Sequence, residues 1–217
     1  MKLDDTGFYA ALIHELKNNL GLLAMTIDQI PAQNEPVHNE AVDAARLLCQ
    51  GVIGRLQQAL FIYKVSQQQM HPAINAYSTQ DLVHEISDQA VALSRGQLKI
   101  GVEIHPEVPA IWFLDRDLIE MALINAIHNS LAYARSTIRI EASMLDGCLA
   151  LTVRDDSEGY PEHVLNSVAT NTPYRSTGTG LGLQFARLIA QSHDNQGRTG
   201  ELRLHNDQGA VFCLVLP

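Results

Sequence analysis

The first candidate for chemistry is a histidine inside a predicted helix, in the stretch HELKNNL, residues 14–20. A neutral imidazole nitrogen is a good nucleophile near pH 7, because its unperturbed pKa is about 6.5. Asn18 follows His14 by four residues, so both lie on one face of the helix. Apolar residues flank the stretch on both sides. His14 is therefore either a polar residue on a solvated helix face or the nucleophile in the reaction of this protein. The stretch alone does not distinguish these two interpretations.

A glycine-rich stretch near the C-terminal end could bind phosphate. Gly178, Gly180 and Gly182 alternate in STGTGLGL, residues 176–183, directly before a predicted helix. Glycine lets the backbone approach an anion closely, and a helix N-terminus favours negative charge. The spacing matches neither GxGxxG nor GxxxxGK[ST], which argues against a Rossmann or P-loop site. Taken alone, the stretch is also compatible with an ordinary turn.

Polar side chains at two further places could complete a nucleotide site. Asp155 ends a predicted strand in VRDDSEGYP, residues 153–161, where its carboxylate could accept a hydrogen bond from an exocyclic amine such as that of adenine. Asn125 and Asn129 share one face of the helix that contains LINAIHNSLAYA, residues 123–134. Buried amides need a partner, and Mg²⁺ that bridges phosphates would be one. The alternatives are an acidic turn at Asp155 and purely structural contacts of the two asparagines.

Two long helices are predicted in front of these motifs, over about residues 4–30 and 36–68, with a proline-bracketed turn between them. The second helix carries a heptad seam at Val42, Ala45, Cys49, Val52, Leu56, Ala59 and Tyr63. Two helices with one narrow seam each cannot enclose a core. We therefore expect an antiparallel hairpin that pairs with a second copy into a dimeric four-helix bundle. The alternative is a hairpin that packs on the downstream domain.

Residues 71–217 read as an α+β domain, an α/β sandwich of one helix layer and one largely antiparallel sheet. Helices are expected at 81–94, 115–134 and 181–192, the last directly after the glycines. Strands are expected at 98–104, 111–114, 137–144, 149–153, 201–205 and 211–216, with Asp146-Gly147 as a hairpin turn. The predicted boundary between hairpin and domain lies at residues 70 and 71.

The composition limits the class of protein. With 217 residues, 46% hydrophobic and 18% charged, the chain is long and apolar enough to fold. A net charge of −9 without a basic tract argues against binding to nucleic acid. Cys49, Cys148 and Cys213 are far apart and are expected to be buried free thiols. No signal peptide or membrane-length apolar run is visible, so a cytoplasmic location is expected.

The order of the motifs carries a resemblance to a known family. HELKNNL resembles the H box of two-component sensor histidine kinases, LINAIHNSLAYA their N box, DDSEGY their first glycine box and GTGLGL their second. The four motifs follow one another as in that family and cover nearly the whole chain. The resemblance implies a dimerisation and histidine-phosphotransfer hairpin over residues 1–70 and a Bergerat-type (GHKL) ATP-binding domain over residues 71–217.

The family's roles can be carried over residue by residue. His14 would accept the phosphoryl group from ATP, Glu15 would act as its general base, and Asn18 would orient water for a phosphatase reaction on the response regulator. Asn129 would bind Mg²⁺ and Asp155 would bind adenine. The remaining nucleotide-binding candidates are Asn125, Gly159, Arg175, Gly178, Thr179, Gly180, Leu181 and Gly182. The partners implied are a response-regulator receiver domain, a second copy of the chain and a separate sensor or regulatory protein.

Several positions depart from the family pattern. Ser157 stands in place of the first glycine of DxGxG, Ala132 in place of the N-box lysine and Asn19 in place of the H-box proline. These changes leave open a histidine phosphotransferase or scaffold with a degenerate ATP site. A chaperone- or gyrase-like ATPase is disfavoured, because those enzymes carry a glutamate where this chain has Asn125. The retained GTGLGL favours the kinase.

Overall fold

The computed structural model describes residues 70–170 and 181–217, and of the N-terminal segment residues 15–16, 18–19, 21–23, 25–26, 45, 48, 51–52, 54–55, 57–59, 61–65 and 68. The chain divides into two compact units, residues 1–70 with 175–181 and residues 71–174 with 182–217. In the first unit the described residues between 15 and 65 are helical. Within the described parts of the chain, no helix is long and apolar enough to cross a bilayer. The antiparallel hairpin and its dimeric bundle stay predictions.

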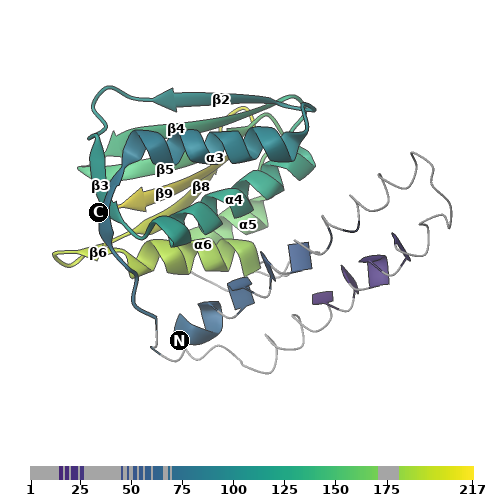
Figure 1. The fold of residues 1–217 in the computed structure, drawn as a ribbon, viewed down its shortest axis with the longest axis horizontal. Helices are drawn as coiled ribbons and strands as arrows, with labels where there is room; N and C mark the ends of the chain where they lie inside the picture. Colours follow the sequence, from purple (N-terminus) through teal and green to yellow (C-terminus); the bar gives the residue numbers. More distant parts are fainter. Residues whose placement is uncertain are drawn as a thin grey trace. The chain divides into compact units, whose positions relative to one another are not determined.

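The second unit is built on a five-stranded sheet in the order β2-β4-β5-β9-β8 (Figure 1). β2 and β4 are parallel, and the other neighbouring strands are antiparallel. The α+β class expected for this region is confirmed. The strands are β2 (Lys99–Ile104), β4 (Thr137–Leu145), β5 (Cys148–Asp155), β8 (Glu201–Asn206) and β9 (Ala210–Leu216).

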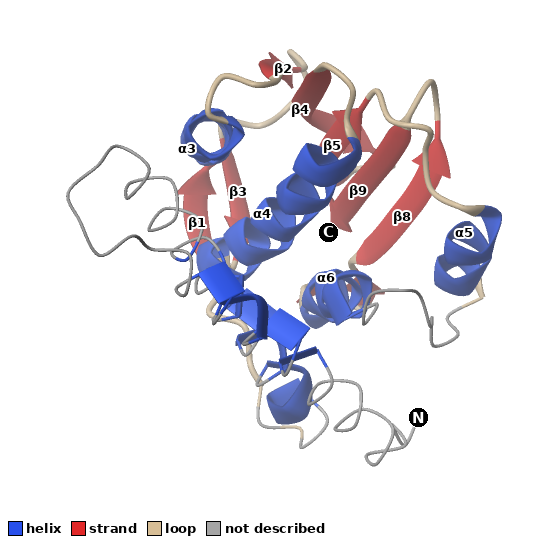
Figure 2. Cartoon of the chain, turned by 90° about the vertical axis from the view of Figure 1, so that its right-hand side faces the viewer, coloured by secondary structure: helices blue, strands red, loops and turns tan. Residues whose placement is uncertain are grey.

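Three helices cover one face of this sheet, α3 (Thr79–Ser94), α4 (Arg116–Tyr133) and α6 (Leu181–Ser192) (Figure 2). A fourth, α5 (Glu162–Ala169), lies near β8. Burial of apolar side chains between the two layers provides the main stabilisation. Its largest members include Ile86, Ile119, Leu123, Ile127, Ile138, Ile140, Leu149, Leu151, Phe185 and Phe212, each exposed by 1% or less.

Three short strands and the helix α5 were not predicted from the sequence, whereas the short strand at 111–114 was expected and is confirmed. β1 (Asn75–Ser78) pairs with β3 (Ile111–Leu114) in a separate two-stranded sheet, and β6 (Asp194–Asn195) pairs with β7 (Arg198–Thr199). β1 has the mixed sequence NAYS, so its strand conformation depends on pairing with β3. The hairpin turn between β4 and β5 is confirmed. Asp146 and Gly147 have φ of 52° and 78°, as a type I′ turn requires.

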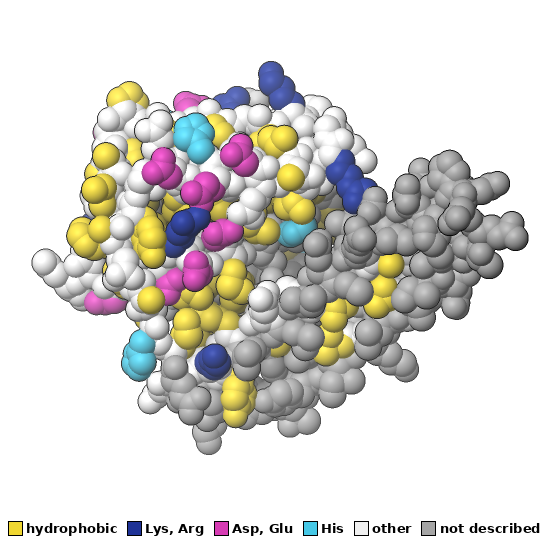
Figure 3. Space-filling view, viewed as in Figure 1, with side chains coloured by type: hydrophobic (Ala, Val, Ile, Leu, Met, Phe, Trp, Pro, Cys, Tyr) yellow, Lys and Arg dark blue, Asp and Glu magenta, His cyan; other side chains and the backbone are white. Residues whose placement is uncertain are grey.

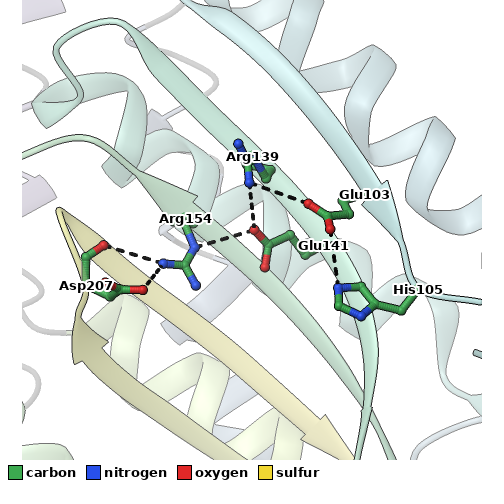
Figure 4. A network of polar contacts seen from close by, with 6 residues as sticks. All are labelled: Glu103, His105, Arg139, Glu141, Arg154 and Asp207. Atoms are coloured by element: carbon green, nitrogen blue, oxygen red, sulfur yellow. Dashed lines mark hydrogen bonds and ion pairs between the residues drawn. The ribbon is translucent and has the colours of Figure 1, made fainter. Parts of the chain in front are cut away.

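The sheet's other face carries a chain of charged side chains (Figure 4). Arg139 lies 3.5 Å from Glu103 and 3.9 Å from Glu141, and Arg154 lies 3.4 Å from Glu141. Next to this chain the same face buries Cys148, Ala150, Cys213 and Val215. The predicted buried thiols are confirmed for Cys148 and Cys213, while Cys49 lies outside the described residues.

The helical side of the unit has an acidic surface (Figure 3). Asp81, Glu85 and Asp88 are exposed along α3, and Asp117 is exposed on the neighbouring helix α4. Arg116 forms an ion pair with Glu85 and offsets part of this charge. An acidic surface repels phosphate groups, so the part of the surface over α3 and the first turn of α4 is unsuited to a nucleotide.

Candidate nucleotide site

The centre of the candidate site is the carboxylate of Asp155 at the end of β5, where it is 7% exposed. Its Oδ2 accepts a hydrogen bond from Ser130 Oγ at 2.7 Å. Its Oδ1 accepts from the backbone N–H groups of Ser157 at 3.0 Å and Ala210 at 3.2 Å. A buried carboxylate is costly unless it is hydrogen-bonded in this way. The three donors fix its orientation, and a carboxylate with its two oxygens can still accept a further donor.

Ser130 is a site residue that sequence reasoning missed. It lies near the C-terminal end of α4, directly after Asn129, and is 6% exposed. Its bond to Asp155 brings the asparagine-bearing part of α4 to the end of β5. Its position next to Asn129 in the N-box motif was the signal that could have identified it.

The loop after β5 explains why Ser157 is tolerated in place of the family's glycine. Gly159 has φ of +88°, which favours glycine, whereas Ser157 does not adopt a positive φ. The Oγ of Ser157 accepts a hydrogen bond from the N–H of Gly159 at 3.1 Å. The serine therefore closes the loop with its side chain, and no glycine is needed there.

The first turn of α6 lies against α4 through Gly182. A Cβ at Gly182 would come within 2.7 Å of Asn125 Nδ2 and 2.8 Å of its Oδ1. Gly182 is thus needed for this close approach of the two helices. The side chain of Asn125 is partly buried and that of Asn129 is exposed. The structure therefore brings Asn125, Asn129, Asp155 and Gly182 to the C-terminal half of α4.

Asp156 follows the candidate adenine ligand directly and has a structural role. Its carboxylate accepts hydrogen bonds from the backbone N–H groups of Arg135, Ser136 and Thr137 and from Ser136 Oγ. These bonds, with the one from Ser136 Oγ strongest, hold the pKa of Asp156 well below its usual range. Asp156 therefore fastens the connection between α4 and β4, and only Asp155 is turned into the interior.

Tyr160 extends the site on the other side of Gly159. Burial raises the pKa of its phenol above the usual value, and the nearby charge of Asp155 raises the same pKa further. Tyr160 is partly buried, and its phenol is poorly solvated. Sequence reasoning gave this residue no role.

Some predicted site residues cannot be placed. His14, Arg175, Gly178, Thr179 and Gly180 lie outside the described residues. Leu181 is buried at the first position of α6.

In the N-terminal unit, Glu15 and Asn18 are helical, and Glu15 forms an ion pair with Arg55. Arg55 was not among the predicted site residues, because its partner lies forty positions away in the sequence.

A magnesium ion would find a suitable but incomplete set of ligands here. Among the described residues, no group of three or more His, Cys, Asp or Glu side chains could hold a metal. The exposed amide of Asn129 offers one hard oxygen ligand. Mg²⁺ often takes one or two protein ligands and otherwise phosphate and water oxygens. The residues present fit an ion that arrives together with a nucleotide.

Comparison with known proteins agrees with this geometry. Residues 114–217 match the model of a family described as histidine kinase-, DNA gyrase B-, and HSP90-like ATPase. This match implies ATP binding. The signal transduction histidine-protein kinase AfsQ2 of Streptomyces coelicolor is 36% identical over 112 residues, which are 48% of this chain and 20% of AfsQ2. AfsQ2 and other curated relatives that the chain matches are described as histidine kinases.

Solved structures show the same fold over most of the chain. The histidine kinase AdeS of Acinetobacter baumannii has a TM-score of 0.66 at 16% identity and covers 94% of this chain and 96% of its own. The histidine kinase ThkA in complex with the response regulator protein TrrA has a TM-score of 0.63 at 17% identity and covers 96% of this chain and 60% of its own. The chain spans between 20% and 57% of the lengths of the first curated relatives it matches.

Proposed function

We propose that this protein is an ATP-dependent histidine kinase that phosphorylates His14 and passes the phosphoryl group to an aspartate of a response regulator. The observation that carries the proposal is Asp155. It is a buried carboxylate at a strand end, held by Ser130 and two backbone N–H groups, inside a segment that matches an ATPase family. Its neighbours supply the amides and the closely packed glycine that a nucleotide site would use.

The residues would divide the work as follows. Asp155 would accept a hydrogen bond from the amino group of adenine, and the glycines of residues 178–182 would surround the phosphates. Asn129 would be the protein ligand of Mg²⁺, which would neutralise phosphate charge. A ring nitrogen of His14 would bond to the γ-phosphorus as the bond to the β–γ bridging oxygen breaks and ADP leaves. Glu15 would take the ring proton, and its ion pair with Arg55 would fix its position.

The second half of the reaction needs a partner. The ThkA structure contains a response regulator, which supports a receiver domain as the acceptor of the phosphoryl group from His14. Asn18 lies one helical turn after His14, where its amide could orient water for removal of phosphate from that regulator. We also propose that the chain acts as a homodimer through its N-terminal helices. A separate sensor or regulatory protein would then set the balance between kinase and phosphatase.

Incubation of the purified chain with Mg²⁺ and γ-labelled ATP tests this function. We expect an acid-labile, alkali-stable phosphoprotein that His14→Gln abolishes, because the label would sit on a ring nitrogen. His71→Gln, which alters an exposed histidine outside the motif, serves as the matched control and should label normally.

Three results would contradict the proposal. Label that survives His14→Gln would exclude His14 as the acceptor. A chain that neither labels nor binds nucleotide would be a phosphotransferase or scaffold without ATP. Steady phosphate release without a phosphoprotein would indicate an ATPase. A phosphorylated receiver domain in the same assay, with and without Asn18→Ala, would test the phosphatase role.

A further inference from the structure

The turn between β8 and β9, residues 206–210, closes on the loop that follows Asp155. Asn206 Oδ1 accepts a hydrogen bond from the N–H of Tyr160 at 2.7 Å, and Asn206 Nδ2 donates to the carbonyl O of Tyr160 at 2.9 Å. One side-chain amide thus satisfies both backbone polar groups of Tyr160, as a neighbouring strand would. The two residues are 46 positions apart in the sequence.

The amide of Asn206 also fits against Gly159. A Cβ on Gly159 would lie 2.6 Å from Asn206 Cγ, and the φ of +88° at Gly159 disfavours any larger residue. Asn206 and Gly159 are therefore matched in shape as well as in hydrogen bonding. The loop conformation at residues 159–160 depends on this side chain.

Other residues of the turn contact Asp155 and the preceding Arg154. Ala210 donates its N–H to Asp155 Oδ1 at 3.2 Å, and a Cβ on Gly209 would lie 1.9 Å from the backbone O of Asp155. Asp207 Oδ2 accepts a hydrogen bond from Arg154 Nη1 at 2.6 Å (Figure 4). The turn is therefore held against the end of β5, and Asn206 extends that contact to the following loop.

We infer that Asn206 is a positioning residue of the nucleotide site, which sets the place of Gly159 and Tyr160 beside Asp155 and so acts at the base end of the nucleotide. This inference rests on the proposed ATP binding. It predicts that Asn206 affects binding of the adenosine part and leaves binding of the phosphates unchanged. The place of Tyr160 in the loop that follows Asp155 supports it, because Asn206 holds both backbone polar groups of this residue and thereby fixes that loop.

Asn206→Asp tests the inference on the full chain, with calorimetric titration of adenosine and of ADP. The change keeps the size of the side chain and its acceptor for the N–H of Tyr160. It places a carboxylate oxygen, without a hydrogen, against the carbonyl O of Tyr160. We expect the Kd of adenosine and the Kd of ADP to rise by the same factor, about tenfold, as for loss of one hydrogen bond with added repulsion. Gln208→Glu adds the same charge at an exposed position of the same turn and should change neither Kd by more than about twofold.

Asn206→Ala is the second variant, because it removes both hydrogen bonds without adding charge. Both variants should keep the circular dichroism of the wild type, and their nucleotide affinities are compared well below their unfolding temperatures. Unchanged affinities with a lower unfolding temperature would overturn the inference, since Asn206 would then be only structural. A loss for ADP without a loss for adenosine would place the effect at the phosphates and would also overturn it. A wild-type chain that binds neither compound would instead contradict the proposed function, and the inference would fall with it.

Discussion

A buried carboxylate lies at each end of helix α4, and the two have different surroundings. Asp115 caps the N-terminus, where its Oδ1 accepts from the N–H of Leu118 at 3.1 Å and its Oδ2 from the N–H of Ala73 at 2.7 Å. Asp155 meets the other end of the helix through Ser130. Each aspartate is 7% exposed and accepts hydrogen bonds on both oxygens. Burial and hydrogen bonding therefore do not distinguish a structural carboxylate from a binding one.

The difference lies in what surrounds the two groups. The backbone N–H of Asp115 donates to His193 Nε2 at 3.0 Å, and this histidine contacts the carbonyl O of Ile189 through Nδ1 at 2.8 Å. That end of α4 is a closed network between elements of the fold. Around Asp155, the chain approaches Gly159 and Gly209 too closely for a Cβ at either position. The backbone N–H of Ser157 donates a hydrogen bond to the carboxylate. The comparison indicates that glycines which let the chain pack closely beside a buried charge are the better sign of a site.

Among the variants that distinguish the two ends of α4, Asp155→Asn should have the largest effect, because it should lose nucleotide binding. The amide can still accept from Ser157 and Ala210 and can donate to Ser130, so the fold should be kept. It can no longer present a carboxylate to the amino group of adenine, and an amide N–H would oppose that donor. We expect the Kd of ADP to rise by at least about 100-fold, measured by calorimetry. An affinity within threefold of the wild type would remove Asp155 from the binding site.

Asp115→Ala should show the opposite behaviour, with lost stability and retained binding. The change removes the cap of α4 and leaves the N–H of Ala73 without its acceptor. We expect the free energy of unfolding to fall by about 2–3 kcal/mol, measured by urea denaturation, while the Kd of ADP under native conditions stays within about twofold. Asp117→Ala, at an exposed position in the first turn of α4, is the control and should cost less than about 1 kcal/mol. Equal losses in the two variants would contradict the capping role of Asp115.

The smallest expected effect is a change in the free energy of unfolding with pH that arises from His193. Burial lowers the pKa of His193, because a charged ring would be poorly solvated there, while the contact with the carbonyl O of Ile189 and the charge of Asp115 oppose this shift. The neutral Nε2 accepts a hydrogen bond from the N–H of Asp115, which a protonated ring could not do. In the unfolded chain the ring titrates near its usual pKa of about 6.5. The unfolded state therefore binds more protons below that pH, and the stability from neutral His193 is complete above it and falls as the pH drops toward the lowered pKa.

His193→Gln should remove this part of the pH dependence. Urea denaturation of wild type and variant between about pH 5 and 7.5 measures it, and we expect a difference in slope below pH 6.5 of up to about 1 kcal/mol per pH unit. Parallel curves for the two proteins would show that His193 is not held neutral by the network at Asp115.

The long elements could be predicted from the sequence because each follows from a local pattern. The helix at 115–134 was expected from its apolar spacing, and the structure has Arg116–Tyr133 with Asp115 as the N-cap. The turn at Asp146-Gly147 was expected from residue type alone. The roles of His14 and of Gly178 and Gly180 stay predictions, since these residues lie outside the described part of the chain.

The residues that sequence reasoning missed all act on distant partners. Ser130 lies 25 positions from Asp155, Asn206 lies 46 positions from Tyr160, and His193 lies 78 positions from Asp115. Serine, asparagine and histidine are common on solvated surfaces, so their type alone indicates no contact.

By itself, the sequence determined the residue types that could do chemistry, the order of their motifs and the periodic elements that carry them. These depend on neighbours three or four positions away in a helix, or two in a strand, and can be read along the chain. Only the tertiary structure decided that Asp155, which the sequence already favoured as the adenine ligand, is buried and held by three donors, whereas the adjacent Asp156 is not buried. That difference depends on Ser130 from α4 and Ala210 from β9, which the five-stranded sheet and its helices bring to the end of β5.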